Sequence, residues 1–219
     1  MEFDLDKARI NMIEQQIRPW DVLDQKVLDT IAAVPRENFV PAAWRNLAFA
    51  DFGIPLGHGQ VMMEPKLEGR MLQELEIGPE DRILEIGTGS GYVTACLARL
   101  GREVDSIEIY EDFSTEAAGR LQRASVGNAS LLNGDASSGW DNGKRYDVIA
   151  VTGSLPEYQP DFEHSLGIGG RLFVIVGEAP AMTALLIRRA SESEITRTKL
   201  FETVLAPLEN AVKPAEFVF

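Results

Sequence analysis

The chain has 219 residues, of which 45% are hydrophobic and 25% charged, and this composition is typical of one globular domain with a sizeable core. Its formal net charge of −13 disfavours a nucleic-acid partner, because neutralising phosphates requires clustered lysine and arginine. The chain has a single cysteine, Cys96, which excludes an intramolecular disulfide. One cysteine and two histidines in the whole sequence are too few ligands for zinc, so we predict no metal site.

The cellular location is indicated by what the sequence lacks. The first residues, MEFDLDKARI, have neither the basic nor the apolar region of a secretory signal peptide. No apolar run approaches the roughly 20 residues that a membrane span requires. A single cysteine suits a reducing compartment. We therefore expect a cytoplasmic protein without a membrane partner, and a Cys96 that packs in the core.

The first part of the chain, residues 1–78, shows the periodicity of helices. Apolar residues spaced by three and four predict helices over 7–16 and 24–34, with Asp24 as the N-cap of the second. A third amphipathic helix is predicted over 66–75 and is entered through Pro65. Residues 1–78 are therefore expected to form an N-terminal helical extension that carries a loop, GHGQVMMEPK.

The second part, residues 79–219, alternates short strands with helices. The predicted strands are 81–87, 103–109, 129–135, 146–153 and 169–177, and the predicted helices are 90–101, 111–124 and a turn of helix near 160–166. This order implies parallel βαβ units. Segments 181–190 and 194–205, joined by the polar SES, predict an antiparallel hairpin at one sheet edge. The fold class is thus α/β, a Rossmann-like doubly wound, mostly parallel sheet with an antiparallel C-terminal edge, which folds with the N-terminal extension as one unit.

The strongest motif is ILEIGTGSGY, which places Gly87, Gly89 and Gly91 between a strand and a helix. Glycine there allows a tight turn and a close approach of a ligand to the backbone. A dinucleotide-binding turn would read G-x-G-x-x-G. Glu85, two residues before Gly87, would repel a phosphate and attract a cation. S-adenosylmethionine carries an ammonium and a sulfonium and no phosphate, so the charge pattern favours this cofactor over NAD.

Two further acids follow the next strands. Glu108 ends the second strand, where it can accept hydrogen bonds from both ribose hydroxyls, and Asp135 follows the third, where an adenine amino group can be bound. Each acid alone is also compatible with a solvated strand end or a turn. Because the carboxyl ends of parallel strands meet, the combination favours a cofactor site. The predicted cofactor-binding residues are Glu85, Gly87, Thr88, Gly89, Gly91, Glu108, Ile109, Asp135 and Ala136.

The segments MIEQQIRPWDVLDQKVLDTIAAVPRENFVPAAWRNLAFAD and IPLGHGQVMMEP resemble the N-terminal half of the protein-L-isoaspartate O-methyltransferase family. LEIGTGSGY and GGRLFVIVG continue the resemblance over essentially the whole chain. It implies a Rossmann-like sheet with a helical cap and methyl transfer from S-adenosylmethionine to the α-carboxylate of L-isoaspartyl residues, which starts the repair of damaged proteins. A carboxylate is already ionised at neutral pH, so this reaction needs no general base.

The loop departs from the family pattern G-x-Q-T-I-S-x-P. Gln60 and Pro65 match it, but Val61 takes the threonine position and Met63 the serine position, with Met62 between them. Neither Val61 nor Met63 donates a conventional hydrogen bond. Losing one hydrogen bond to a charged group costs about 1.5–3 kcal/mol. These five residues form the predicted substrate loop, and no catalytic side chain is assigned within it.

Three functions therefore remain open. The chain is an isoaspartyl methyltransferase, a methyltransferase of the same fold with another small-molecule or protein acceptor, or a cofactor-binding module whose transfer site has decayed. Within the resemblance, TGSLPEYQP lies where the acceptor should approach and APLENA resembles the segment that closes over it. Glu209 would repel an anionic acceptor if it pointed inward, and we expect it to face solvent. The apolar end, EFVF, is expected to cap the core, and His58 to have a structural role.

Overall fold

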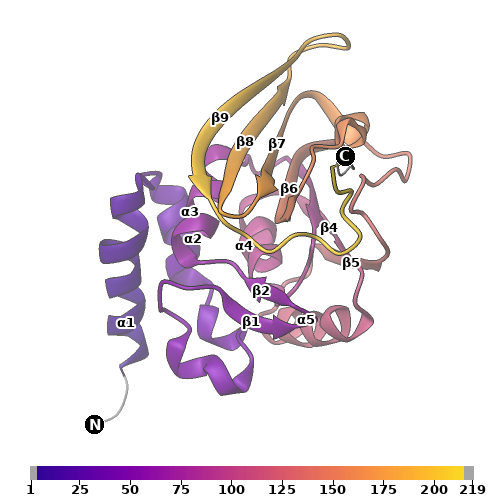
Figure 1. Cartoon of the computed structure of the whole chain (residues 1–219). Helices are drawn as coiled ribbons and strands as arrows, with labels where there is room; N and C mark the ends of the chain where they lie inside the picture. Colours follow the sequence, from indigo (N-terminus) through magenta and orange to yellow (C-terminus); the bar gives the residue numbers. More distant parts are fainter. Residues whose placement is uncertain (1–3, 215–219) are drawn as a thin grey trace, which may run out of the picture.

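A computed structural model describes residues 4–214, and the terminal EFVF lies outside the described residues. Its main feature is a seven-stranded sheet in the order β5-β4-β3-β6-β7-β8-β9 (Figure 1). The strands are β3 (Arg82–Ile86), β4 (Glu103–Glu108), β5 (Ala129–Asn133), β6 (Tyr146–Leu155), β7 (Leu166–Glu178), β8 (Ala181–Arg189) and β9 (Ile195–Thr203). Pairing is parallel from β5 to β7 and antiparallel between β7, β8 and β9. The predicted fold class and its C-terminal hairpin are confirmed.

The helices follow the predicted periods, with small differences at their ends. They are α1 (Leu5–Met12), α2 (Gln25–Ala33), α3 (Pro65–Glu74), α4 (Tyr92–Leu100) and α5 (Glu111–Arg123). The Asp24 carboxylate accepts a hydrogen bond from Lys26 N at 2.8 Å and caps α2, as predicted. The helix predicted over 7–16 instead leaves α-helical geometry after Met12 and continues as a π-helix over Ile13–Ile17. Within residues 4–214, no helix has the length and apolar character needed to cross a bilayer.

A short hairpin replaces the predicted loop over residues 57–66. Strands β1 (Ile54–Gly57) and β2 (Gln60–Met62) pair antiparallel, and His58 and Gly59 form the turn with φ of 50° and 74°. Positive φ at both central positions is the requirement of a type I′ turn. The strands are too short to show an alternating pattern in the sequence, which is why the hairpin was not predicted. His58 thus has the structural position expected for it.

The two faces of the sheet bury different layers. Ile83, Val148 and Phe173 point into a cluster that includes residues of the N-terminal helices and α4. Their strand neighbours Leu84, Ile149 and Leu172 point to the opposite face, where the 3-10 helix Pro160–Ser165 contributes Phe162. Alternation of this kind follows from the period of two along a strand. The region predicted as a helix near 160–166 is therefore this short 3-10 helix.

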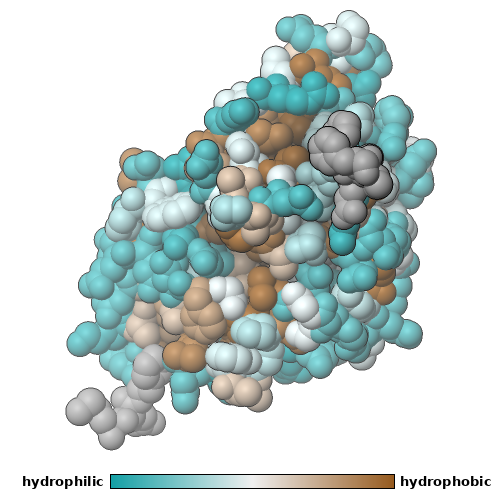
Figure 2. All heavy atoms as spheres, in the orientation of Figure 1, coloured by the Kyte–Doolittle hydropathy of each residue, from teal (hydrophilic) through white to brown (hydrophobic). Residues whose placement is uncertain are grey.

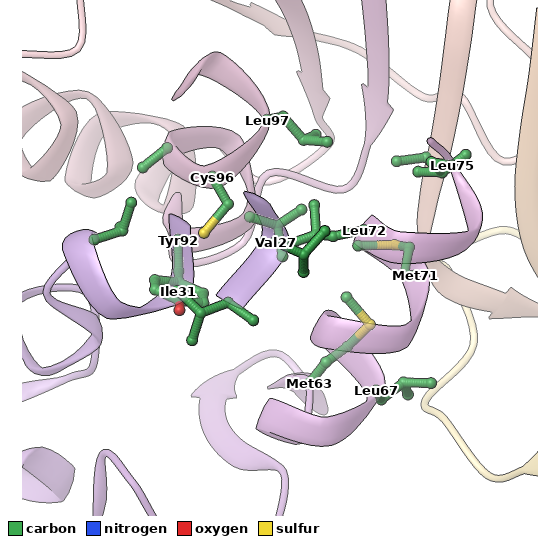
Figure 3. Close-up of a cluster of buried hydrophobic side chains, with 14 of the residues drawn as sticks. Val27, Ile31, Met63, Leu67, Met71, Leu72, Leu75, Tyr92, Cys96 and Leu97 are labelled. Atoms are coloured by element: carbon green, nitrogen blue, oxygen red, sulfur yellow. The ribbon is translucent and has the colours of Figure 1, made fainter. Parts of the chain in front are cut away.

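Figure 3 shows how the N-terminal helices join the sheet layer. Val27 and Ile31 of α2 and Leu67, Met71, Leu72 and Leu75 around α3 lie close to Tyr92, Cys96 and Leu97 of α4. Cys96 is fully buried in this cluster, and burial raises the pKa of its thiol well above the ordinary value. A packed, unreactive thiol is therefore its role, as expected.

A buried ion pair crosses the same region. Arg36 and Glu68 are 0% and 1% exposed, and Arg36 Nη1 donates to Glu68 Oε2. The other guanidinium nitrogens donate to backbone carbonyls, Nε to Ala48 O at 2.8 Å and Nη2 to Met63 O at 2.7 Å. The guanidinium carbon lies 4.9 Å from the centre of the Tyr92 ring. One side chain thus connects the 36–48 connector, the end of the hairpin, α3 and α4.

Replacing Arg36 by methionine is expected to lower the free energy of unfolding by about 3–5 kcal/mol, because Glu68 becomes an unpaired buried carboxylate. Urea denaturation at neutral pH measures the change. The matched control is Arg45→Met, since Arg45 is exposed and donates to Asn38 Oδ1 at 3.2 Å, and about 0.5 kcal/mol or less is expected there. Equal stabilities for the two variants would contradict the structural role of Arg36.

Candidate functional site

A pocket with about 560 Å³ of empty volume lies where the carboxyl ends of β3, β4, β5 and β6 meet. This is the edge at which open α/β sheets bind ligands, and the volume suits a small organic molecule. Each strand end contributes to the wall. The lining residues are Leu56, Gln60, Val61, Ile86, Gly87, Gly89, Ile107, Glu108, Ile109, Tyr110, Phe113, Gly134, Asp135, Ala136, Ser137, Thr152, Gly153, Leu208 and Glu209.

The glycine turn after β3 forms one wall of this pocket. Gly87, Gly89 and Gly91 have φ of 94°, 51° and 83°, a region that other residues rarely adopt. A Cβ atom on Gly87 would meet Thr152 Oγ1 at 2.5 Å, and one on Gly89 would meet Leu56 Cδ1 at 3.2 Å. Gly87 and Gly89 line the pocket. Gly91 does not; a Cβ atom there would meet Ala117 Cβ of α5 at 3.1 Å, so it serves the packing of the turn.

Two carboxylates face the pocket from neighbouring strand ends. Glu108 is 4% exposed, and its two oxygens accept hydrogen bonds from Gly89 N at 2.8 Å and Tyr110 N at 3.0 Å. Asp135 accepts from Ser137 N at 3.0 Å and from Asn210 Nδ2 at 2.8 Å. Burial opposes ionisation of Asp135, but these hydrogen bonds outweigh it and lower its pKa. The predicted positions Ile109 and Ala136 lie beside these acids in the wall.

Glu85 does not occupy the predicted position in the site. Its side chain is 0% exposed and is not among the residues that line the pocket, so the predicted contact with a bound cation finds no support in this geometry. Glu85 Oε2 accepts from Thr94 Oγ1 at 2.5 Å and from Ser106 Oγ at 2.6 Å. Burial raises its pKa to about 8. Glu85 therefore connects α4 to β4 beneath the glycine turn.

The β1–β2 hairpin and the C-terminal segment form a roof over the pocket. The His58 ring stacks on Tyr110 with centroids 4.0 Å apart, and Gln60 Nε2 donates to Pro207 O at 3.0 Å. Tyr110 Oη donates to Glu209 Oε2 at 2.7 Å, which raises the pKa of Tyr110 to about 12. Figure 2 shows apolar side chains in the middle of this face, with hydrophilic residues around them.

The roof also decides the position of Glu209. The Glu209 side chain is exposed, as expected. Tyr110 also holds it at the pocket rim, so it faces the site as well as solvent. The TGSLPEYQP segment reaches the same place, because Ser154 N donates to Ala206 O and Leu208 N to Ser154 O, both at 2.9 Å. Tyr110 and Leu208 were not predicted as lining residues of the first pocket, since their positions depend on contacts between distant segments.

A second pocket, with about 290 Å³ of empty volume, adjoins the first. The two share Leu56, Val61, Gly87, Gly89 and Thr152, and the remaining residues of the second pocket are Met62, Met63, Glu68, Thr88, Ser90 and Val93. Thr88 thus belongs to this second pocket, and Pro65 starts α3 outside both.

The predicted substrate loop is therefore split by the structure. Gln60 and Val61 face the first pocket, and Val61 lies between the two. Met63 is 3% exposed and packs in the core cluster (Figure 3), although it contributes to the wall of the second pocket. The methionine in the serine position of the family pattern is thus largely a core residue. Among residues 4–214, no group of His, Cys, Asp or Glu side chains could hold a metal ion.

Comparisons with known proteins point to one family. The family model described as protein-L-isoaspartate(D-aspartate) O-methyltransferase matches residues 7–213. A protein-L-isoaspartate O-methyltransferase of Koribacter versatilis is 37% identical over 94% of this chain and 91% of that protein. Protein-L-isoaspartate O-methyltransferase 1 of Rhodopseudomonas palustris is 36% identical over 91% of this chain and 82% of that protein.

Solved structures share the fold. A Plasmodium falciparum structure described as a protein-L-isoaspartate O-methyltransferase in complex with S-adenosyl-L-homocysteine superposes with a TM-score of 0.80 at 18% identity, covering 95% of this chain and 99% of that one. A second structure, named protein-L-isoaspartate O-methyltransferase, has a TM-score of 0.77 at 21% identity over 96% of this chain and 67% of that one.

The buried carboxyl of Glu85 predicts a pH dependence of stability. Its pKa is about 8 in the folded chain against an ordinary value of 4.5, so between these values the folded state binds more protons than the unfolded state. The free energy of unfolding therefore falls as the pH rises through this window, by at most about 1.4 kcal/mol per pH unit from this group. Glu85→Gln is expected to remove that contribution and to gain stability relative to the native chain as the pH rises.

Urea denaturation near pH 5 and near pH 9 measures this difference. The control is Glu111→Gln at the exposed start of α5, a surface substitution that is expected to change the free energy of unfolding by about 0.5 kcal/mol or less. A Glu85→Gln difference that did not change with pH would show that Glu85 is ionised throughout the window.

Proposed function

The chain belongs to the protein-L-isoaspartate(D-aspartate) O-methyltransferase family and is an S-adenosylmethionine-dependent methyltransferase, and from this membership we propose that it methylates the α-carboxylate of L-isoaspartyl residues in damaged proteins. Its partners would be proteins or peptides that carry such residues. The observation that supports this most directly is the second pocket, which adjoins the first and shares Val61 and four other wall residues with it. An acceptor bound there would lie next to a ligand held at the strand ends.

The first pocket suits S-adenosylmethionine in its charge and in its backbone. Its described lining residues include Glu108, Asp135 and Glu209 and neither lysine nor arginine, which favours a cationic ligand without phosphate. Gly87 and Gly89 leave the backbone open where a side chain would clash. Glu108 would hold the ribose hydroxyls and Asp135 the adenine end. The glycine turn would hold the amino-acid end.

The bound cofactor supplies an electrophilic methyl group, whose bond to sulfur breaks as a bond to a carboxylate oxygen forms, leaving a neutral thioether and a neutral ester. The residues of the chain have to orient the acceptor and exclude water. No side chain needs to remove a proton, because the acceptor carboxylate is already ionised. The roof formed by Gln60, Tyr110 and Glu209 lies at the rim of the first pocket and would limit the access of bulk water to it.

The test is the transfer of labelled methyl groups from S-adenosylmethionine to an isoaspartyl peptide, with the matching aspartyl peptide as control and cofactor binding measured on the same sample. We expect a base-labile methyl ester on the isoaspartyl peptide alone. A blank without peptide is needed, because Asn133-Gly134 and Asn142-Gly143 of the chain are themselves able to form isoaspartyl residues. Bound cofactor without transfer to the isoaspartyl peptide would contradict the proposed acceptor.

Val61→Thr is expected to raise kcat/KM for the isoaspartyl peptide by up to about tenfold, since it places a hydroxyl donor of similar shape between the two pockets. Initial rates of labelled transfer measure the effect, with the exposed Val204→Thr as control. Met63→Ser is not an equivalent test, because removing this core side chain is expected to cost about 2–5 kcal/mol of stability. Unchanged kcat/KM in Val61→Thr would show that this position does not contact the acceptor.

A further inference from the structure

The second pocket contains three hydroxyls, and two of their protons are already used. Thr152 Oγ1 donates to the carbonyl oxygens of Ile86 and Gly87 at 2.9 and 2.6 Å. Ser106 Oγ donates to Glu85, so the 2.5 Å contact between Thr88 and Ser106 is left with Thr88 as its donor. Both hydroxyls are therefore committed to the strands beneath the pocket.

The third hydroxyl, that of Ser90, is different. Its Oγ accepts a hydrogen bond from Tyr92 N at 3.2 Å, and its own proton finds no acceptor among residues 4–214. Ser90 is 5% exposed and lines the second pocket. It is therefore the hydroxyl of this wall whose proton is available to a ligand. Ser90 lines the same pocket as Val61 and Met63, the two positions at which the hydroxyl donors of the family pattern are missing.

Glu68 offers the opposite kind of group. Its Oε2 is paired with Arg36, whereas Oε1 is buried and has no hydrogen-bond partner within the described part of the chain. Leaving a buried oxygen without a donor is unfavourable, and more so for a charged group than for a neutral one. Glu68 is among the residues that line the second pocket, and Oε1 is the oxygen that would accept a hydrogen bond from a ligand bound there.

The surroundings of Glu68 also reduce its repulsion of the carboxylate of an acceptor bound nearby. The ionisable groups next to it are Arg36, Tyr92 and Cys96, and of these Arg36 carries a positive charge that offsets its own. Burial raises the pKa of Glu68 to about 7, while Arg36 opposes this rise. An anionic acceptor therefore meets a pair of nearly zero net charge instead of an isolated carboxylate.

We propose that Ser90 and Glu68 recognise the acceptor: the Ser90 hydroxyl donates to the acceptor carboxylate, and Glu68 Oε1 accepts from an N–H group on the same carbon atom. An L-isoaspartyl residue within a peptide has this arrangement, since its α-carboxylate and its amide nitrogen share one carbon. In an ordinary aspartyl residue the side-chain carboxylate is one methylene further from the N–H. The inference rests on the proposed function and assigns its selectivity to two residues outside the hairpin loop.

The first test changes the substrate and leaves the protein intact. An isoaspartyl peptide is compared with its depsipeptide analogue, in which an oxygen atom replaces the N–H of the isoaspartyl residue. We expect kcat/KM for the analogue to be about ten- to a hundredfold lower, the effect of one hydrogen bond to a charged group. Binding of each peptide to the protein loaded with S-adenosylhomocysteine, followed by calorimetry, is expected to show a loss of similar size.

The second test uses variants. In Glu68→Gln the amide oxygen faces Arg36 and its NH₂ group faces the pocket, so the preference for the N–H peptide over the depsipeptide should disappear. Ser90→Ala should lower kcat/KM for both peptides by about tenfold and keep the preference. Glu37→Gln is the matched control, because Glu37 is also buried with one oxygen unpartnered among the described residues, but it pairs with Arg9 and lines neither pocket.

The outcomes separate this inference from the proposed function. Efficient transfer to both peptides alike would overturn the role of Glu68 and leave isoaspartyl methylation standing. No transfer to the isoaspartyl peptide by a protein that binds the cofactor would overturn both. Thermal melting and S-adenosylhomocysteine affinity report whether Glu68→Gln is folded. If Glu68→Gln is not folded, the comparison of the isoaspartyl peptide with its depsipeptide analogue on the native chain still tests the role of Glu68.

Discussion

The buried pair of Arg36 and Glu68 is the interaction on which the geometry of the second pocket depends. A charged pair is buried at a large desolvation cost, which is offset only when nearly every polar atom is satisfied. Arg36 meets this condition by bonding to Glu68, Ala48 O and Met63 O. The bond to Met63 O fixes the point where the hairpin ends and α3 begins. Met63 and Glu68 both line the second pocket, so the pair holds two residues of that wall in place.

The fold was predictable because its signals are local and repeated. Alternation of strands and helices, the glycine turn and the acids at strand ends are each visible in short windows of sequence, and parallel pairing then brings Glu108 and Asp135 together. The roof was not predictable. Its bond between Tyr110 and Glu209 joins residues 99 positions apart, and the β1–β2 strands are too short to show a period. The burial of Glu85 was not predicted for another reason. Along β3 it alternates with Leu84 and Ile86, so it shares the face of Ile83 that α4 covers.

Acidic side chains near the site differ in function because their surroundings differ. Asp135 accepts hydrogen bonds that lower its pKa, whereas Glu85 is buried deeply enough for its pKa to rise to about 8. Glu68 has one oxygen satisfied by a cation and one not. Residue type alone therefore says little about role here. Access to the pocket separates these carboxylates, because Glu85 and Glu108 each receive two hydrogen-bond donors and only Glu108 lines the first pocket.

The roof over the first pocket has a consequence for the speed of events in each catalytic cycle. It consists of the tip of the hairpin, residues 207–209 and the start of α5, joined by single hydrogen bonds and one ring stack at the surface. Such contacts are worth about 0.5–1.5 kcal/mol each, so they open many times faster than a packed core would. A cofactor that enters or leaves beneath these contacts would part them, although the two pockets are only partly separate, because they share five residues of their walls. Loosening of the roof is thus expected to accompany each entry and exit of the cofactor, and its speed to be set by these surface contacts and not by the core.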